Sequence, residues 1–551
     1  MLKPAARVGL PTGVTCLNSR LVKWIPPLAF LGVLFIWPLS NILSRGFQGD
    51  WVFHLLNPRD WSITWFTVWQ ALLSTLLTLV FAIPGAYLLY RKKFWGQRAL
   101  RSLITIPFML PTIVVATGFT VFRDAGHLWS NPVFWIITAH VFLNYSLAVR
   151  TIGSFWMSLD LHTEEAAALS GAGRFRTVWS ISLPQLKPAL ISAAASTFLY
   201  CSASYGVILV LGGGQVHSLE TEIATAANTL LDLPKASALA LIQTLLSVVA
   251  FGITQTGGRA NIGIEVGEHD GDVKNLDKRD WLAALITFPL IGVLIVAPMS
   301  MIIYKTFAEG SGFIGNFLNL GGRGTRNILN LSVVDAMGNS FRNMVISATI
   351  AMVIGVAVSY LLALPTKNVR QVISNRVLDV MFLLPLGIST VVLGFGYLVT
   401  FGGYPLPLRE TWLVTPLIQS VMSVPIVIRL VYPALVSVER SHFEAASTAG
   451  ANRWQIWWFI ELPMIRFSVY TAAAFAALVS LGEFGAASLL AYGDQATLPT
   501  VLYSLISKPG GQNYGMAMAA GTLIIVLTFA VVFAISRENL QERQPKRNGL
   551  A

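Results

Sequence analysis

Two stretches of this 551-residue chain share one pattern of residue types. Each reads Glu-Ala-Ala, three residues, Gly, nine residues, Ile, any residue and Leu-Pro. Glu and Ala favour helix and Gly adopts positive φ angles that other residues avoid, so each stretch is predicted to form a short helix and a turn. The alanines leave a low surface that a second protein can approach closely. The pattern therefore fits a docking element.

The two copies align without a gap. Glu444 minus Glu165 and Pro463 minus Pro184 both give 279. The candidate docking residues of the first loop, 160–187, are Glu165, Ala166, Ala167, Gly171, Arg174, Leu183 and Pro184. Those of the second loop, 439–466, are Glu444, Ala445, Ala446, Gly450, Arg453, Leu462 and Pro463. An ordinary interfacial helix is the alternative for one copy, but two aligned copies favour docking. Each Leu-Pro is expected near the start of the next span, where a missing N–H does no harm.

The composition predicts that membrane helices position these loops. Only 12% of residues are charged, against about 25% in soluble chains, and a spanning helix needs about 20 apolar residues. About twelve such segments occur, near 24–44, 63–90, 101–122, 133–157, 188–210, 235–255, 281–304, 339–364, 376–400, 413–436, 467–490 and 513–535. We therefore expect an all-α polytopic membrane protein whose surface contacts lipid.

The net charge of +12 is an orientation signal. Basic residues gather before the first span, between the second and third, between the eighth and ninth, and after the last. These segments share one side if the spans alternate, and basic short loops mark the cytoplasmic face. We expect the inner membrane of a prokaryote, both termini cytoplasmic, and 211–234 and 305–338 facing outward. A role in binding nucleic acid is excluded on this reasoning.

The polar segment 259–280 is rich in Gly, Asp and Glu and is predicted to be a cytoplasmic linker. It separates a first half, 1–258, from a second half, 281–536, which a tail at 537–551 follows. Both halves start on the same side, so they are two parallel six-helix repeats. Such repeats suggest a pseudo-twofold axis along the membrane normal.

Because it carries both motif copies, the chain resembles the permease subunits of binding-protein-dependent ABC importers. The resemblance covers essentially its whole length. The resemblance implies the type I importer permease fold, with each docking helix seated on an ABC ATPase subunit, two copies in all. It also implies a separate extracytoplasmic binding protein. No G-x-x-x-x-G-K-[ST] phosphate loop occurs, so ATP is expected on the partner, with no cofactor, metal site or catalytic residue on this chain.

A polar residue inside a span is costly and tends to be functional. Glu483 is the clearest case, and the 279-residue offset places Ser204 opposite it, with Tyr205 opposite Phe484. These four residues are the candidate substrate path. The alternative is that Glu483 pairs with an arginine or caps a neighbouring helix.

The connection between the fifth and sixth spans of each half, with Gly-Glu-Phe-Gly at 482–485, resembles the fused permeases for thiamine and for ferric iron. The run Gly212–Gly214 and the Leu-Pro-Thr at 498–500 favour thiamine, with ferric iron next. A twelve-span secondary transporter is the main rival, but it would bury several coupling charges. A membrane receptor would not need two equivalent docking loops.

Overall fold

The computed structural model describes residues 13–48, 57–125, 131–256, 274–364, 368–403 and 406–542. Within these ranges nine helices are long and apolar enough to cross a membrane, and up to twelve spans result when three bent helix pairs count as one each. Two dipeptides, β1 (Lys92–Lys93) and β2 (Lys274–Asn275), form the one parallel strand pair found there. The all-α polytopic fold is confirmed.

The helices of the first half are α1 (Gly13–Leu31), η1 (Gly32–Ile36), α2 (Trp37–Gln48), α4 (Pro58–Arg91), α5 (Gln97–Met109), α6 (Thr112–Ala125), α7 (Pro132–Met157), α8 (Leu161–Leu169), α9 (Arg174–Thr177), η2 (Val178–Ser182), α10 (Leu183–Ser202), α11 (Gly206–Gly212), α12 (Leu219–Asn228) and α13 (Leu233–Thr256). The short turn η3 (Lys278–Asp280) precedes the second half.

The helices of the second half are α14 (Trp281–Leu290), η4 (Ile291–Val296), α15 (Ala297–Ala308), α16 (Gly312–Leu318), η5 (Asn319–Gly321), η6 (Thr325–Asn327), α17 (Val333–Ala363), α18 (Val369–Leu383), η7 (Leu384–Gly387), α19 (Thr390–Thr400), η8 (Leu408–Glu410), α20 (Val414–Ser437), α21 (Arg440–Thr448), α22 (Arg453–Ile456), η9 (Trp457–Glu461), α23 (Leu462–Gly482), α24 (Gly485–Leu490), η10 (Gly493–Gln495), α25 (Leu498–Ser507) and α26 (Gly511–Glu542).

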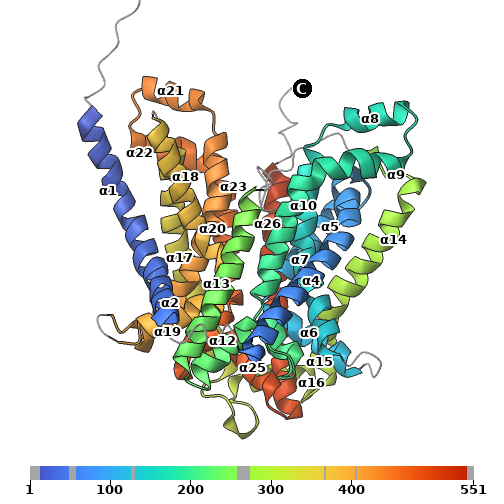
Figure 1. The fold of residues 1–551 in the computed structure, drawn as a ribbon, viewed down its shortest axis with the longest axis vertical. Coiled ribbons are helices and arrows are strands. Elements are labelled where there is room, and N and C mark those ends of the chain that lie inside the picture. Colours follow the sequence, from blue (N-terminus) through green and yellow to red (C-terminus); the bar gives the residue numbers. More distant parts are fainter. Residues whose placement is uncertain are drawn as a thin grey trace, which may run out of the picture.

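The first span of each half packs against the other half. The α1–α2 span lies along α17 and α19, and the α14–α15 span lies along α4 and α6 (Figure 1). The backbones approach closely: a Cβ added to Gly396 would lie 2.9 Å from Ile42 Cδ1, and one added to Gly118 would lie 3.0 Å from the Pro298 carbonyl oxygen. The two halves are therefore interlocked and not merely joined by the linker.

Two spans that hydropathy predicts as straight are sharply bent. The pair α5–α6 bends by 99° and the pair α18–η7–α19 by 97°. Pro111 disfavours helical angles in the preceding residue, and Leu110 is extended, with ψ 141°. In the second half, the Ser389 hydroxyl accepts hydrogen bonds from the backbone N–H groups of Val391 and Val392 and so starts a new helix. Hydropathy cannot reveal these bends because both arms are apolar.

Four helical turns with π geometry share one position relative to proline. The turns η1, η2, η4 and η9 each end two residues before a proline, at Pro38, Pro184, Pro298 and Pro463. The residue before each proline donates its N–H five residues back, as Leu183 does to Val178. Proline lacks an N–H and its ring clashes with the carbonyl four residues before it, so the wider turn lets the helix continue. Pro184 and Pro463 thus open α10 and α23, as expected, within unbroken helices.

The end of the predicted linker is anchored to the first half. Residues 257–273 lie outside the described part, but β2 pairs with β1, and Asp280 lies 3.0 Å from Lys92 Nζ. The Tyr87 hydroxyl also donates to Asp280, at 3.0 Å. Burial alone would raise the pKa of Asp280, but the Asp277 N–H, Lys92 and Tyr87 together hold it below its usual value. The domain boundaries themselves stay a prediction.

Candidate functional site

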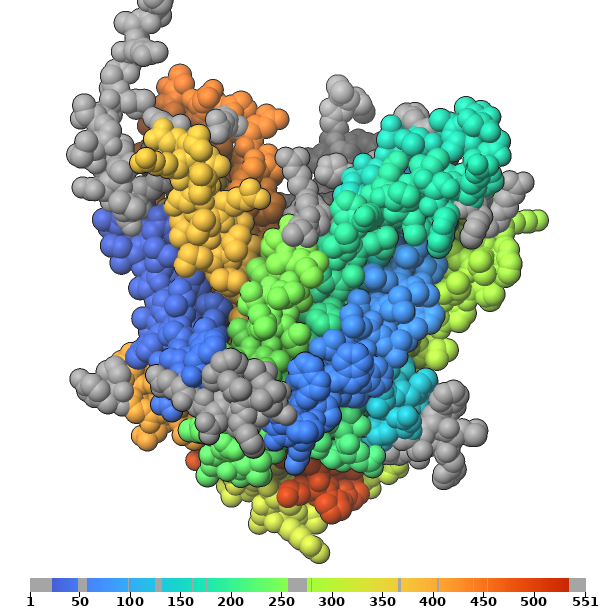
Figure 2. Space-filling view, in the orientation of Figure 1, coloured from blue at the N-terminus to red at the C-terminus, as the bar shows by residue number. Residues whose placement is uncertain are grey.

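The two predicted docking helices, α8 and α21, lie at the same end of the molecule on opposite sides of it (Figure 1). Helix α1 also begins at this end. In the space-filling view, the docking regions of the two halves stand apart from each other (Figure 2). We call this the docking end, and the opposite end, which carries α12, α16 and α25, the far end.

Each docking helix ends in the same glycine cap. Gly171 has φ +80° and Gly450 has φ +86°. The N–H of Ala172 donates to the Ala167 carbonyl at 3.0 Å, and Ala451 donates to Ala446 at the same distance. This six-to-one bond belongs to the Schellman motif. A Cβ at either glycine would meet nothing within 4 Å, so the backbone angle and not a lack of space requires glycine. The predicted helix and turn are confirmed.

The motif residues present an open surface at both loops. Glu165 and Ala166 are exposed and Ala167 is half-buried, and the second copy repeats this order at Glu444, Ala445 and Ala446. Leu183 and Leu462 are half-buried, whereas Pro184 and Pro463 are exposed. The side chains of Arg174 and Arg453 lie outside the described residues. The exposed, capped helices suit contact with a partner protein.

An ionic tether, which sequence reasoning missed, holds the first docking loop. Glu164, which precedes the motif, lies 3.0 Å from the buried Arg91 guanidinium, and the Ser182 hydroxyl donates to Glu164 at 3.0 Å. Arg91 also donates to the Trp156 and Leu159 carbonyl groups at the end of α7. The second half has Phe443 and Leu364 where the offsets of 279 and 273 place the counterparts of Glu164 and Arg91. The tether is therefore specific to the first half.

We predict that Glu164→Ala destabilises the chain by about 3 kcal/mol, because it leaves Arg91 buried without its partner charge. The measurement is thermal unfolding of the purified chain in detergent. Glu439→Gln, which changes the exposed acid before α21, is the matched control and should shift the midpoint little. Equal midpoints for Glu164→Ala and the unmodified chain would contradict the tether.

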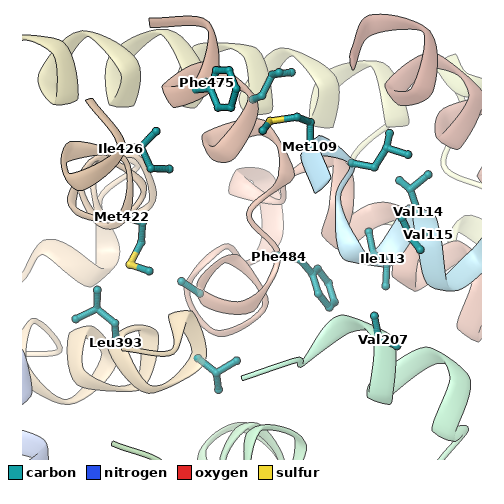
Figure 3. Packing of buried hydrophobic residues seen from close by; sticks show 14 of the residues in the cluster. Met109, Ile113, Val114, Val115, Val207, Leu393, Met422, Ile426, Phe475 and Phe484 are labelled. Carbon is teal, nitrogen blue, oxygen red and sulfur yellow. The ribbon is translucent and has the colours of Figure 1, made fainter. Parts of the chain in front are cut away.

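Tyr205 and Phe484 meet between the two halves. Their rings stack with centroids 5.3 Å apart and planes 20° apart. The two residues correspond through the 279-residue offset, and residues related by a twofold axis touch each other only near that axis. Figure 3 shows the Phe484 ring turned toward the side on which Ile113 and Val207 of the first half lie. The predicted pair therefore lies on the pseudo-twofold axis, with Ser204 buried beside it.

Glu483 is turned toward the backbone of α24. Its two carboxylate oxygens accept hydrogen bonds from Ala486 N–H at 2.7 Å and from Ala487 N–H at 3.0 Å. The side chain is buried, with 7% exposed. This is the capping arrangement that the sequence left open as an alternative. A role of Glu483 in the substrate path stays a prediction.

The fifth-to-sixth connections form a matched pair at the far end. Helices α12 and α25 both begin with a capping box, Ser218 with Thr221 and Thr497 with Thr500. The first N–H of α12 donates to Thr67 Oγ1 at 3.0 Å, and that of α25 donates to Ser340 Oγ at 2.8 Å. The two connections are therefore a structural repeat.

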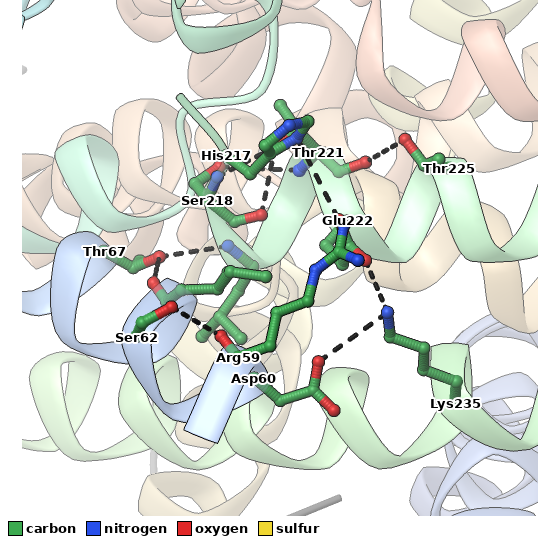
Figure 4. Close-up of polar contacts among 12 residues, drawn as sticks. Arg59, Asp60, Ser62, Thr67, His217, Ser218, Thr221, Glu222, Thr225 and Lys235 are labelled. Atoms are coloured by element: carbon green, nitrogen blue, oxygen red, sulfur yellow. Dashed lines mark hydrogen bonds and ion pairs between the residues drawn. The ribbon is translucent and has the colours of Figure 1, made fainter. Parts of the chain in front are cut away.

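A buried charge cluster fixes α12 in the first half only (Figure 4). Lys235 Nζ lies 2.5 Å from Glu222 Oε1 and 3.6 Å from Asp60 Oδ1. His217 lies 3.9 Å from Glu222 at the edge of the cluster. In the second half, Asp60 corresponds to Val333, Glu222 to Val501 and Lys235 to Tyr514. Sequence reasoning missed this cluster because Asp60 lies far along the chain from Glu222 and Lys235.

Polar contacts join the halves at the far end. The Ser389 hydroxyl of the second half donates to Glu220 of α12. Asn228 donates to the Ser488 carbonyl at 3.3 Å and accepts from the Tyr492 hydroxyl at 3.2 Å. Burial raises the pKa of Glu220 to about 8, although the Ser389 hydrogen bond opposes this. The halves thus meet at the far end, while the docking helices stand apart at the other.

A cavity of about 300 Å³ adjoins the ring pair at the far end. Its walls include the aromatic side chains of Tyr205, Phe484, Tyr492 and Tyr503 and the 328–331 segment before α17. Glu483 is not among the residues that line it.

Residues 78–256 and 355–544 both match the family described as binding-protein-dependent transport system inner membrane component. The chain belongs to this family. Each matched range contains one docking motif, so the expectation of a fused, two-half permease is confirmed. Family membership makes it a multi-pass inner membrane component of an ABC importer and leaves the secondary transporter and receptor alternatives without support.

Similar proteins span nearly the whole chain. The thiamine transport system permease protein ThiP of Brucella abortus (strain 2308) is 25% identical over 490 residues, covering 85% of this chain and 86% of that protein. ThiP of Haemophilus influenzae is 24% identical, covering 92% and 94%. ThiP of Escherichia coli (strain K12) is 25% identical, covering 90% and 92%. None of these names supports the ferric iron expectation.

Proposed function

We propose that this chain imports thiamine, delivered by an extracytoplasmic binding protein and driven by ATP hydrolysis on two copies of a separate ATPase subunit. The observation that carries the substrate is the similarity, over at least 85% of either chain, to permeases named for thiamine transport. The two exposed, glycine-capped helices at one end support the pair of ATPase subunits. On this proposal the chain binds no cofactor and catalyses no reaction.

The path of thiamine runs along the pseudo-twofold axis, past Ser204, Tyr205, Glu483 and Phe484. On this proposal, the stacked Tyr205 and Phe484 rings are the barrier that closes the path toward the far end. When ATP draws the ATPase subunits together, α8 and α21 approach each other. Because the halves are interlocked through their first spans, this motion is transmitted as a rotation that separates the rings. ATP hydrolysis then restores the arrangement seen here.

The test is uptake of labelled thiamine into proteoliposomes that contain this chain, the ATPase subunit and the binding protein. Uptake should require all three components and ATP. Thiamine uptake that persists without ATP and follows an ion gradient would instead identify a secondary transporter. Uptake of ferric iron without thiamine would refute the proposed substrate.

The docking end is proposed to be cytoplasmic, which predicts the outcome of cysteine labelling. In a background in which serine replaces Cys16 and Cys201, Gly173→Cys should react with an impermeant thiol reagent only from the inside of the membrane. Asn319→Cys, in η5 at the far end, should react from the outside. Labelling of both positions from outside would contradict the orientation.

The carboxylate of Glu483 is predicted to favour a cationic substrate. Glu483→Gln keeps a carbonyl oxygen for the α24 N–H groups but removes the charge. We therefore expect thiamine uptake to fall about threefold to tenfold at normal membrane abundance, which corresponds to about 1 kcal/mol. Abundance, co-purification of the ATPase and uptake are measured in one preparation. Reduced abundance with unchanged uptake per molecule would show that capping is its sole role.

A further inference from the structure

The lining of the far-end cavity has a distinct chemistry. Aromatic residues of the lining include Tyr205, Phe484 and Tyr503, and hydroxyl-bearing residues include Ser488 and Ser504. None of the described residues that line it carries a formal charge. Hard metal cations are bound in proteins by several charged or strongly polar oxygen ligands, chiefly carboxylates, so the lining does not suit a bare metal ion.

The rings are arranged at more than one angle. Phe484 lies nearly parallel to Tyr205, and it meets Tyr503 with centroids 5.8 Å apart and planes 56° apart. Ring faces attract organic cations within about 6 Å. Tyr492, at one wall, already has the Arg409 guanidinium 5.9 Å from its ring centre, and Tyr205 is stacked on Phe484. We therefore assign Phe484 and Tyr503 as the rings that a ligand would contact.

On the proposed function, the cavity lies where a substrate would enter the permease. It adjoins the Tyr205–Phe484 stack, which lies between the halves, and it is at the far end, where a binding protein would deliver its ligand. Its volume of about 300 Å³ reaches the lower limit of pockets that hold small organic ligands. The Ser488 and Ser504 hydroxyl groups can orient polar substituents of a heterocycle.

We propose that this cavity is a binding site for a planar aromatic cation, held against Phe484 and Tyr503 before the stacked rings part. The proposal rests on the proposed function and deepens it, because the thiazolium ring of thiamine belongs to this chemical class. The site gives the permease its own selectivity, added to that of the binding protein.

The experiment measures equilibrium binding of radiolabelled thiamine to the purified permease–ATPase complex without the binding protein. Tyr503→Leu should weaken binding about tenfold, and Tyr503→Phe should stay within about twofold because the ring face remains. Tyr304→Leu is the matched control, since Tyr304 lies on α15, is 60% exposed and does not line the cavity. The Tyr304→Leu complex should bind thiamine with the same affinity as the unmodified complex. Co-purification of the ATPase confirms that each variant is folded.

Equal thiamine affinity in Tyr503→Leu and the unmodified complex, with uptake by the latter intact, would overturn the site and leave the proposed function standing. If the unmodified complex fails to take up thiamine with every component present, the proposed function fails and the site fails with it. The cavity could instead receive a loop of the binding protein. In that case Tyr503→Leu should weaken docking of the ligand-free binding protein and leave the thiamine affinity unchanged. That outcome also overturns the site.

Discussion

Gly450→Val is expected to lose most ATP-driven uptake while it reaches the membrane at normal abundance. Gly450 has φ +86°, and a β-branched residue in that region costs about 1–3 kcal/mol. This corresponds to a roughly tenfold to hundredfold smaller population of correctly capped α21. Because a docking helix that lacks its turn cannot seat on the ATPase, co-purification of the ATPase should fall together with uptake.

Gly171→Val should act in the same way but with a smaller loss. The first docking loop is also held by the Glu164 tether to Arg91, whereas the second half has no counterpart. Gly173→Val is the matched control, because Gly173 lies two residues from the cap, has no positive φ, and has free space around an added Cβ. Normal uptake by both Gly171→Val and Gly450→Val would refute the docking assignment.

Lys235→Met is expected to cause the largest loss of stability, about 3–5 kcal/mol in the free energy of unfolding. Removing the ammonium group takes away the cation that contacts both Asp60 and Glu222, two carboxylates that are each about 2% exposed. The measurement is a denaturant titration of the purified chain in detergent micelles. Retained stability in Lys235→Met would show that solvent or His217 already neutralises the cluster.

The second half supplies the matched control for this cluster. Replacing all three charges with the residues at the corresponding positions, as Asp60→Val, Glu222→Val and Lys235→Tyr in one chain, should restore stability to within about 1 kcal/mol. Buried ion pairs are often replaceable by packed apolar residues, whereas a broken pair is costly. A triple variant as unstable as Lys235→Met would mean that packing, and not charge, is disturbed.

The sequence alone determined the features that depend on local pattern. Long apolar segments predicted the membrane helices because the bilayer requires a fixed length of apolar residues. The constant offset of 279 predicted two equivalent halves. Gly171 and Gly450 predicted the helix caps, since a glycine after a short helix is the residue that most readily adopts positive φ. These predictions needed no knowledge of what packs against what.

Only the tertiary structure decided which groups meet. The structure shows that Glu483 caps α24, that Glu164 pairs with Arg91 and that Tyr205 stacks on Phe484. The Glu164 and Tyr205 contacts depend on where other helices lie. The Glu483 cap is local, but hydropathy, which reports only that a segment is apolar, cannot distinguish a cap from a substrate contact. Likewise, the bends at Leu110 and Ser389 leave both arms apolar, so the same hydropathy fits a straight span or a folded one. The long-range packing of the two halves therefore fixed the axis, the cavity and the charge cluster, because their members come from segments far apart in the sequence.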